Sequence, residues 1–440
     1  MTTRKIEVAI VGGGIAGLAL AAGLIKQQHL NVQVYEGVAQ YSDVGAGLAL
    51  HLNAIKAMGL LGPEVRQAYF DKALSMGEEH QETATEVILA YGRYTGQVVA
   101  ELGRAKGRKT VSRADLLDGF RALIPPSHIG FGKRLRDIVE LPASGGHRRL
   151  RLNFEDGTSA WADCLLGADG IHSVTRAYLL GVDHPATTPK NHDGWQIYRT
   201  MVSTEEARKQ IDPKWTTSVP IFLGPKGHVN CIPLNKNTRL SAGVAICGGA
   251  SEQPRARKSL DPRVYKDYSK DARQIIDMVA KDTSSSWAAA DHDHAPFYAR
   301  NNVAIFGDAA HAALPFAGNG AAQALEDAAV LNALFECISE PKEVATALRA
   351  FCEVRRPRSQ AVVDLSRKFG RIYAFAEDGM HEDPARMKNF FVLTAAMTNY
   401  FDVKRQNDEA VKLFRQLLES SANSQAYSYL SLHATTRECL

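Results

Sequence analysis

The sequence lacks the cysteine and charge patterns that mark several protein classes. Its six cysteines form no C-x-x-C pair, and no cluster of cysteine and histidine has the spacing of a zinc site. We therefore expect free thiols in a reducing compartment and no metal. The net charge of +4 over 440 residues, without a dense block of lysine and arginine, gives no support for nucleic-acid binding.

Long hydrophobic runs and a recognisable targeting segment are also missing. The most apolar stretch lies near the N-terminus, where Gly12, Gly14, Gly17 and Gly23 interrupt it, so it predicts a buried strand and helix and no membrane span. These absences favour a cytoplasmic protein. The hydrophobic content of 45% is that of an ordinary globular chain, and the length allows two domains with a helical extension.

The stretch "VAIVGGGIAGLALAAGL", residues 8–24, carries a G-x-G-x-x-G motif. The surrounding sequence predicts a strand over 5–11, a helix over 15–28 and a second strand that ends at Glu36. Alone, the glycine motif is weak evidence. Within a strand–helix–strand unit that ends in a carboxylate, it predicts a dinucleotide site.

Each residue of this pattern has its own task. Gly12 allows a tight turn, Gly14 lets a pyrophosphate approach the backbone, and Gly17 lets the helix pack on the strand. The carboxylate of Glu36 can accept hydrogen bonds from a ribose and would repel a 2′-phosphate, so NADP is not expected here. No second complete fingerprint follows, so any further dinucleotide should bind transiently.

Two later segments also have the residue pattern of a nucleotide-binding domain. "GADGIHSVTR", residues 167–176, follows a predicted strand and places Asp169 at its end. "GDAAHAALPFAGNGAAQALEDA", residues 307–328, places Asp308 after another strand and leads through a small-residue loop into a long helix. Between them, strand-like runs from about 185 to 290 predict a separate sheet.

Two smaller features lie between the first motif and the second. Ser112 is expected to cap a helix through Asp115, which places Arg113 in the first turn; this arginine could serve a ligand or the solvated surface. The pair Gly45 and Gly47 suggests a backbone turn against a flat group.

In this order, the three motifs resemble those of class A flavoprotein monooxygenases, which share the para-hydroxybenzoate hydroxylase fold. The resemblance covers residues 5 to about 370, and "VSRADLLDGF", "IYRTMV" and "FCEVRRPRSQ" are most similar to salicylate hydroxylases. Fungal enzymes that hydroxylate phenolic polyketides share the same segments.

The resemblance implies an α/β fold with three parts. A Rossmann-like FAD-binding domain would comprise 1–75, 104–184 and 290–370, and an inserted mixed β-sheet domain for the substrate would comprise 76–103 and 185–289. A C-terminal helical region would occupy 371–440. The sequence does not choose between a monomer and a homodimer.

The resemblance also implies an activity and its cofactors. FAD would be tightly bound, NADH or NADPH would be a transient co-substrate, and O₂ would be activated as a flavin C4a-hydroperoxide that hydroxylates a phenol. Salicylate would give catechol with loss of CO₂. Open alternatives are a larger phenolic polyketide, hydroxylated with or without loss of aromaticity, and a flavin-dependent reductase that never activates oxygen.

The site residues follow from the matching motifs. Those expected to bind the cofactor are Gly12, Gly14, Ile15, Ala16, Gly17, Glu36, Gly47, Arg113, Asp169, Asp308, Gly318, Gly320, Ala321 and Ala322. Those expected to meet the substrate are Arg199, His228, Ile232 and Phe316, with Arg199, Phe316 and Gly318 nearest the chemistry. His311 is expected to have a structural role.

Two departures from the bacterial relatives concern the substrate. Phe316 stands where those enzymes carry histidine, and Ile232 stands where they often carry an aromatic residue. Asn319 also replaces an alanine. These changes predict a more apolar pocket and weaken the direct transfer of the substrate.

Overall fold

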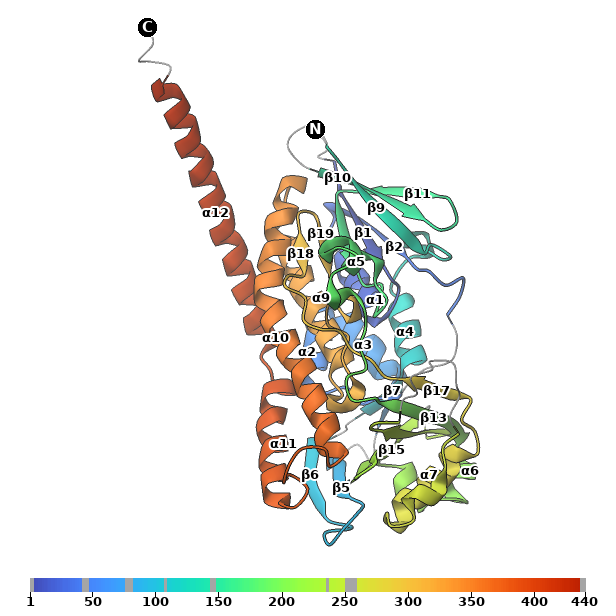
Figure 1. Cartoon of the computed structure of the whole chain (residues 1–440). Coiled ribbons are helices and arrows are strands. Elements are labelled where there is room, and N and C mark those ends of the chain that lie inside the picture. The colour runs from blue at the N-terminus through green and yellow to red at the C-terminus, as the bar shows by residue number, and fades with distance from the viewer. Residues whose placement is uncertain are drawn as a thin grey trace.

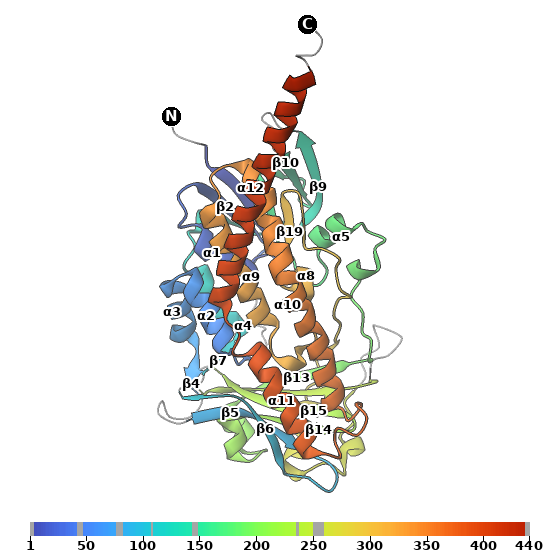
Figure 2. The same ribbon diagram turned by 90° about the vertical axis from the view of Figure 1, so that its left-hand side faces the viewer.

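The computed structural model describes residues 4–41, 47–75, 82–106, 109–142, 148–234, 237–249 and 259–435. One β-sheet lies in the upper half of Figure 1 and another in the lower half, and the long helix α10 (Val344–Tyr373) runs beside both. Figure 2 shows α11 (Pro384–Thr398) and α12 (Val403–Thr435) on the same flank as α10. The predicted α/β class with C-terminal helices is confirmed.

The upper sheet has six strands in the order β18–β19–β12–β1–β2–β8. β1 (Ile6–Val11) pairs in parallel with β2 (Leu30–Tyr35) and β12 (Cys164–Gly167), and β12 pairs in parallel with β19 (Val303–Ile305). α1 (Ile15–Leu24) joins β1 to β2 and ends about one turn earlier than predicted. Because these strands are parallel, the segments that follow them meet at one edge of the sheet.

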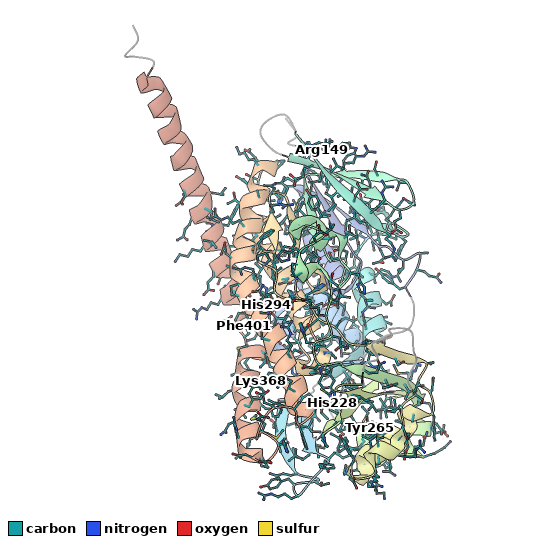
Figure 3. All side chains as sticks on the ribbon, in the orientation of Figure 1. Arg149, His228, Tyr265, His294, Lys368 and Phe401 are labelled. Carbon is teal, nitrogen blue, oxygen red and sulfur yellow. The ribbon has the colours of Figure 1, made fainter. Side chains whose placement is uncertain are left out.

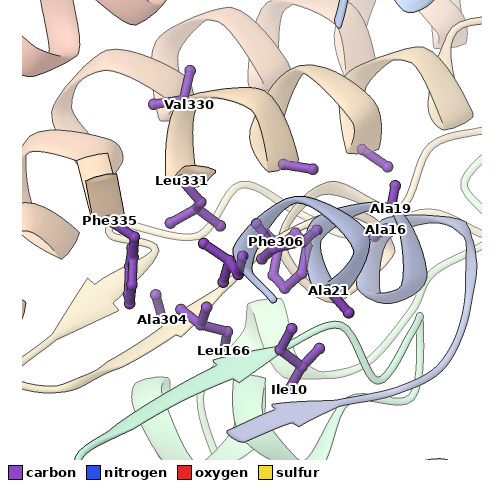
Figure 4. Packing of buried hydrophobic residues seen from close by; sticks show 14 of the residues in the cluster. Ile10, Ala16, Ala19, Ala21, Leu166, Ala304, Phe306, Val330, Leu331 and Phe335 are labelled. Atoms are coloured by element: carbon purple, nitrogen blue, oxygen red, sulfur yellow. The ribbon is translucent and has the colours of Figure 1, made fainter. Parts of the chain in front are cut away.

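Small side chains let α1 approach this sheet closely. The helix is mostly alanine, glycine and leucine, and every residue after Ile15 is buried. It packs on β1 on one side and on α9 (Gly320–Cys337) on the other. Figure 4 shows this core, with Leu166 on a strand, Phe306 at its centre and Leu331 on α9.

The lower sheet has seven strands in the order β17–β13–β16–β15–β14–β5–β6. Its neighbours are antiparallel except for β14 and β5, so it is a mixed sheet, as predicted. The strands are β5 (Glu82–Leu89), β6 (Val98–Lys106), β13 (Gln196–Ser203), β14 (Val219–Gly224), β15 (Gly227–Leu234), β16 (Arg239–Ile246) and β17 (Ser285–Ala288).

The two faces of the lower sheet have different neighbours. On one face, Tyr198 and Val244 share a core with the helix α7 (Lys270–Ala280). On the other, Ile197 and Ala245 pack with Phe316 and with residues of α10 and α11. We call this second face the inner face, because the loop before α9 lies against it.

The two edge strands of the upper sheet are β18 (Ala299–Arg300) and β8 (Ile129–Gly130). Two small sheets have the strand orders β11–β10–β9 and β3–β7–β4. Their strands and the other helices are β3 (Gly47–Leu48), α2 (Leu52–Leu61), α3 (Pro63–Lys72), β4 (Leu74–Ser75), β7 (Lys109–Ser112), α4 (Arg113–Arg121), β9 (Leu135–Pro142), β10 (Arg148–Phe154), β11 (Ser159–Ala162), α5 (Val174–Leu180), α6 (Thr204–Arg208) and α8 (Asp308–His311). Among the residues the structure describes, no helix combines the length and apolar character that a bilayer crossing requires.

Candidate functional site

The three glycines of the first motif have different surroundings. Gly12 has a φ of +104°, and a Cβ there would collide with the carbonyl oxygen of Ala168. A Cβ on Gly17 would collide with the carbonyl oxygen of Gly12. A Cβ on Gly14 would meet nothing within 4 Å. The outer glycines therefore serve close packing, and the middle one faces open space in front of the N-terminus of α1, where Ile15 and Ala16 form the first turn.

The carboxylate of Glu36 lies beside this turn. It accepts hydrogen bonds from the backbone N–H of Gly13 at 2.6 Å and of Val38 at 2.9 Å. The hydroxyl of Tyr41 donates to the carbonyl oxygen of Gly13 at 2.7 Å, and burial raises the pKa of this tyrosine. Because each carboxylate oxygen has two lone pairs, Glu36 keeps acceptor capacity for a ribose.

Arg113 is the first residue of α4 and is exposed. Ser112 caps this helix as predicted, since its hydroxyl oxygen accepts from the N–H of Asp115 at 3.0 Å. The pair of β3 and β7 sets Gly47 opposite Ser112, and a Cβ on Gly47 would lie 3.0 Å from Cγ2 of Ile232 in the lower sheet. Gly47 thus lies between the two halves of the molecule. Gly45 lies outside the described residues.

Asp169 is bound within its own segment. Its carboxylate accepts from the hydroxyl of Ser173 at 2.5 Å and from the N–H and hydroxyl of Thr175 at 3.0 and 3.1 Å. Burial raises the pKa of Asp169, and these hydrogen bonds oppose the shift. The side chain therefore shapes the turn after β12, and Gly170, at φ +78°, leaves open space beside it.

Sequence reasoning missed the role of Arg176, although the residue ends the quoted "GADGIHSVTR". Its guanidinium is fully buried and donates to the carbonyl oxygens of Ala309 at 3.0 Å and Ala310 at 2.7 Å. It also donates to Ala186 and Asp293. Burial lowers the pKa of Arg176 to about 10. This arginine, which lies on α5, therefore links α8 to the segments at Ala186 and Asp293.

Asp308 begins α8 at the same edge of the sheet and is exposed. Behind it, the N–H of Gly307 donates to Asp327 at 2.9 Å, and His311 bonds the same carboxylate at 2.5 Å. Burial opposes ionisation of Asp327, but its contacts with His311 and Arg355 outweigh burial and lower the pKa of Asp327 to about 2. His311 is a buried structural residue, whereas Asp308 is directed outward.

The loop before α9 reaches the same region. Gly318 is left-handed, with φ +63°, and a Cβ on Gly318 or Gly320 would meet nothing within 4 Å. Gly320, Ala321 and Ala322 form the first turn of α9, so their N–H groups have no partner within the helix. This terminus is suited to a negatively polarised group.

Arg199 and His228 lie on the inner face of the lower sheet. Arg199 is two residues from Ile197, and His228 pairs with Ala245 across β15 and β16, so all four side chains point to one face. From the register and the usual strand spacing, the Cα atoms of Arg199 and His228 lie about 12 Å apart.

Arg199 has no ion-pair partner among the residues the structure describes. Its guanidinium carbon lies 5.2 Å from the ring centroid of Trp287, a cation–π distance. Burial lowers the pKa of Arg199, which remains a cation. A half-buried guanidinium held by an indole is suited to a planar anion.

Phe316 extends from the loop onto His228. Their ring centroids are 5.2 Å apart, and the ring of Trp195 lies 4.3 Å from that of Phe316. A Cβ on Gly370 would collide with the Phe316 ring, so α10 needs glycine at this point. The structure therefore brings Phe316 and His228 together. Figure 3 labels His228 in the lower half of the molecule.

Around Phe316, three buried polar atoms have no hydrogen-bond partner among the described residues. They are the indole N–H of Trp195, Nδ1 of His228 and the hydroxyl of Tyr373, whose ring lies 5.1 Å from that of His228. Burial lowers the pKa of His228 to about 3 and raises that of Tyr373. All three groups are therefore uncharged at neutral pH. Trp195 and Tyr373 gave no signal in the sequence beyond their proximity to recognised segments.

The family described as FAD binding domain matches residues 133–366, more than half of the chain. A 6-methylsalicylate 1-monooxygenase of Aspergillus terreus is 35% identical over 429 residues, which cover 96% of this chain and 95% of that protein. The chain belongs to the group A FAD-dependent monooxygenases. A salicylate hydroxylase of Pseudomonas putida is 33% identical over 400 residues, covering 85% of this monooxygenase and 87% of its relative.

A solved structure agrees with this assignment. A salicylate hydroxylase in complex with its substrate has a TM-score of 0.77 and 27% identity to this monooxygenase, over 93% of this chain and 98% of that one. The residues of the site fit FAD, because the space in front of Gly14, Gly318 and Gly320 lies open while Gly12 and Gly17 are packed. The backbone at the edge of the upper sheet is therefore chemically suited to a dinucleotide.

Proposed function

We propose that this monooxygenase hydroxylates a phenolic carboxylate of the salicylate type, with O₂ and NADH or NADPH, and releases CO₂ and a catechol. One salicylate anion, one NADH, one O₂ and two protons balance one catechol, one CO₂, one NAD⁺ and one water. The C–CO₂ bond breaks, its electron pair stays with the ring, and NADH supplies the two electrons that reduce the second oxygen atom to water. The observation that carries this proposal is the half-buried Arg199 on the inner face, which has no ion-pair partner among the described residues.

The cofactor residues remain those expected from the motifs. Gly12, Gly14 and Gly17 with the first turn at Ile15 and Ala16 would hold the pyrophosphate, and Glu36 would hold the adenosine ribose. Arg113, Gly47, Asp169 and Asp308 would border the middle of FAD, and the first turn of α9 would face the flavin. When bound, FAD supplies hydride acceptance and oxygen activation. The carboxylate of Asp169 already accepts hydrogen bonds from Ser173 and Thr175. We therefore propose that Asp169 fixes the shape of the backbone beside FAD.

Arg199 would bind the substrate carboxylate before it leaves as CO₂. A guanidinium offers a planar fork of donors, and its half-buried position over Trp287 strengthens the attraction to an anion. Apolar contacts from Phe316 and Ile232 would hold the ring and keep water away. These contacts orient the phenol between the sheet and the loop before α9.

His228 would meet an uncharged part of the substrate. With a pKa of about 3 it carries no positive charge at neutral pH, so it cannot replace Arg199 as the anion site. Its unpartnered Nδ1, together with the hydroxyl of Tyr373, suits a neutral hydroxyl group. Arg199 and His228 thus differ in charge, which favours a substrate with one anionic end and one neutral end.

We also propose how the nicotinamide binds, where the protein is located and which oligomeric states it has. The reduced nicotinamide would visit the site and leave, because the sequence holds one complete glycine fingerprint. The described cysteines Cys164, Cys231, Cys247, Cys337 and Cys352 are free thiols, which fits the cytoplasmic location that we propose. We keep both a monomer and a homodimer as possible states.

The decisive experiment is to incubate the purified protein with salicylate, O₂ and NADH or NADPH in parallel. We expect catechol, one O₂ consumed per catechol, and faster oxidation of one nicotinamide when salicylate is present. If FAD is reduced but no tested phenol causes O₂ uptake, the protein is instead a reductase.

A larger phenol is the second candidate. Phe316 and Ile232 make the pocket more apolar than histidine and an aromatic residue would, and this favours a bulkier ring system. Turnover of a phenolic polyketide with no catechol from salicylate would support that candidate over the first.

A further inference from the structure

The N-terminus of α9 is preceded by a residue that should cap it but does not. Asparagine is among the best helix-capping residues, because its side-chain oxygen accepts from the free N–H groups of the first turn. Asn319 occupies the capping position of α9 and makes no such bond. Its backbone, at φ −114° and ψ 0°, is not the extended form that capping requires.

The amide of Asn319 bonds away from the helix instead. Its Nδ2 donates to the carbonyl oxygen of Ala317 at 2.8 Å and to Oδ1 of Asn399 at 3.4 Å. Its Oδ1 accepts from Nδ2 of Asn53 at 3.5 Å. All three asparagines are at least 95% buried. They come from α2, from the loop before α9 and from the junction between α11 and α12.

This junction is fixed independently of Asn319. The N–H of Asn53 donates to the carbonyl oxygen of Asn399 at 3.1 Å, and Nη1 of Arg358 donates to that of Met397 at 2.9 Å. The guanidinium of Arg358 also lies 3.3 Å from the ring centroid of Phe401, which Figure 3 labels. Asn399 is therefore a fixed acceptor to which the side chain of Asn319 is held.

Asn53 and Arg358 both donate hydrogen bonds to the carboxylate of Glu326. Nδ2 of Asn53 donates to this carboxylate at 2.8 Å, and Arg358 donates to it at 2.7 and 2.8 Å. Glu326 is fully buried on α9 itself. The junction, α2 and α9 are thus linked through one carboxylate, so the position of Asn399 relative to the α9 terminus is well defined.

We propose that Asn399 is a positioning residue that keeps Asn319 from capping α9, so that the N–H groups of Gly320, Ala321 and Ala322 stay available to the flavin of FAD. The inference rests on FAD binding by this family and is independent of the substrate. A self-capped helix would satisfy its own N–H groups and would compete with the negatively polarised edge of the flavin. The C-terminal helices therefore belong to the cofactor site.

The test compares Asn399→Ala, Asn319→Ala and the double variant. The measured quantities are the FAD dissociation constant and the affinity of sulfite for bound FAD, which increases with the positive potential next to the flavin. We expect Asn399→Ala to weaken sulfite binding about tenfold, because Nδ2 of Asn319 then keeps only its bond to the carbonyl oxygen of Ala317, and the residue can change its backbone and side chain together to the capping form. In the Asn319→Ala background the same change should have no effect, because alanine cannot cap.

A second pair of variants leaves the C-terminal junction intact. Asn319→Ser introduces a short neutral cap that cannot reach Asn399, so it should weaken sulfite binding as Asn399→Ala does, whereas Asn319→Ala should not. This pair remains informative even if Asn399→Ala does not fold.

The matched control is Asn407→Ala. Asn407 is 6% exposed, lies on α12 and donates to the carbonyl oxygen of Ala329, far from the N-terminus of α9. It should lower the thermal stability of the apoprotein and leave sulfite affinity unchanged. Equal effects of Asn399→Ala and Asn407→Ala on sulfite, or additive effects of Asn399→Ala and Asn319→Ala, would overturn the proposal.

Discussion

The upper and lower sheets build their parts of the site in different ways. At the edge of the upper sheet, the contacts offered to a ligand come mainly from backbone, since Gly14, Gly318 and Gly320 leave open space around N–H groups. On the inner face of the lower sheet, they come from side chains such as Arg199 and His228. A backbone cradle needs particular residues at short sequence spacing, whereas a side-chain pocket depends on the register of distant strands.

The largest expected effect is at the edge of the upper sheet. Asp308→Ala should yield a folded protein that loses FAD on purification, because the exposed carboxylate is available to the cofactor and supports no other described contact. The absorbance of FAD per protein measures this. Full flavin occupancy in the variant would remove Asp308 from the cofactor site.

Arg199→Ala should impair substrate turnover without affecting FAD binding, and so distinguish the role of the lower sheet from that of the upper sheet. We expect kcat/KM for salicylate to fall by roughly 100-fold, the size of a lost charge-assisted contact, while FAD content stays unchanged. Steady-state kinetics with parallel FAD quantitation test it. Arg199→Lys is the control, since it keeps the charge without the planar fork. Unchanged kinetics would place the anion site elsewhere.

Gly14 and Gly17 offer a matched pair within the first motif. Gly17→Ala should destabilise the apoprotein by about 1–3 kcal/mol, because its Cβ collides with the carbonyl oxygen of Gly12. Gly14→Ala should leave apoprotein stability nearly unchanged and weaken FAD binding, because its Cβ enters the open space. Urea unfolding and FAD titration distinguish the two. Equal loss of stability in both variants would contradict the division between packing and ligand contact.

The smallest expected effect is a pH dependence that arises from His228. Its folded pKa of about 3 lies below the ordinary value of 6.5, so the unfolded state binds a proton first as the pH falls. Stability is complete above about pH 6.5 and decreases toward pH 3, by about 2 kcal/mol between pH 7 and pH 5. His228→Gln should flatten this part of the curve in urea unfolding. A wild-type curve with the same slope as the variant would show that His228 is not buried as a neutral group.

The features of the site that could be predicted are those that depend on residues close together in the sequence. The strand–helix–strand unit and the cap at Ser112 depend on neighbours in sequence, and the structure has both. Arg176 was quoted within a motif, yet its role depends on carbonyl oxygens more than 100 residues away. Trp195 directly precedes β13, and Tyr373 is the last residue of α10. Nothing in the local sequence indicated that they surround Phe316.

The sequence by itself determined the nucleotide-binding half and the family, because short-range spacing of glycines and carboxylates dictates turn geometry at strand ends. Only the tertiary structure decided what surrounds Phe316, which we propose lies at the substrate. Strand register places Arg199 and His228 on one face, and the packing of α10 against the loop buries Phe316 between Trp195 and His228. Likewise, only the folded chain brings Asn399 to Asn319, since hydrogen bonds between residues 80 positions apart depend on how the helices pack.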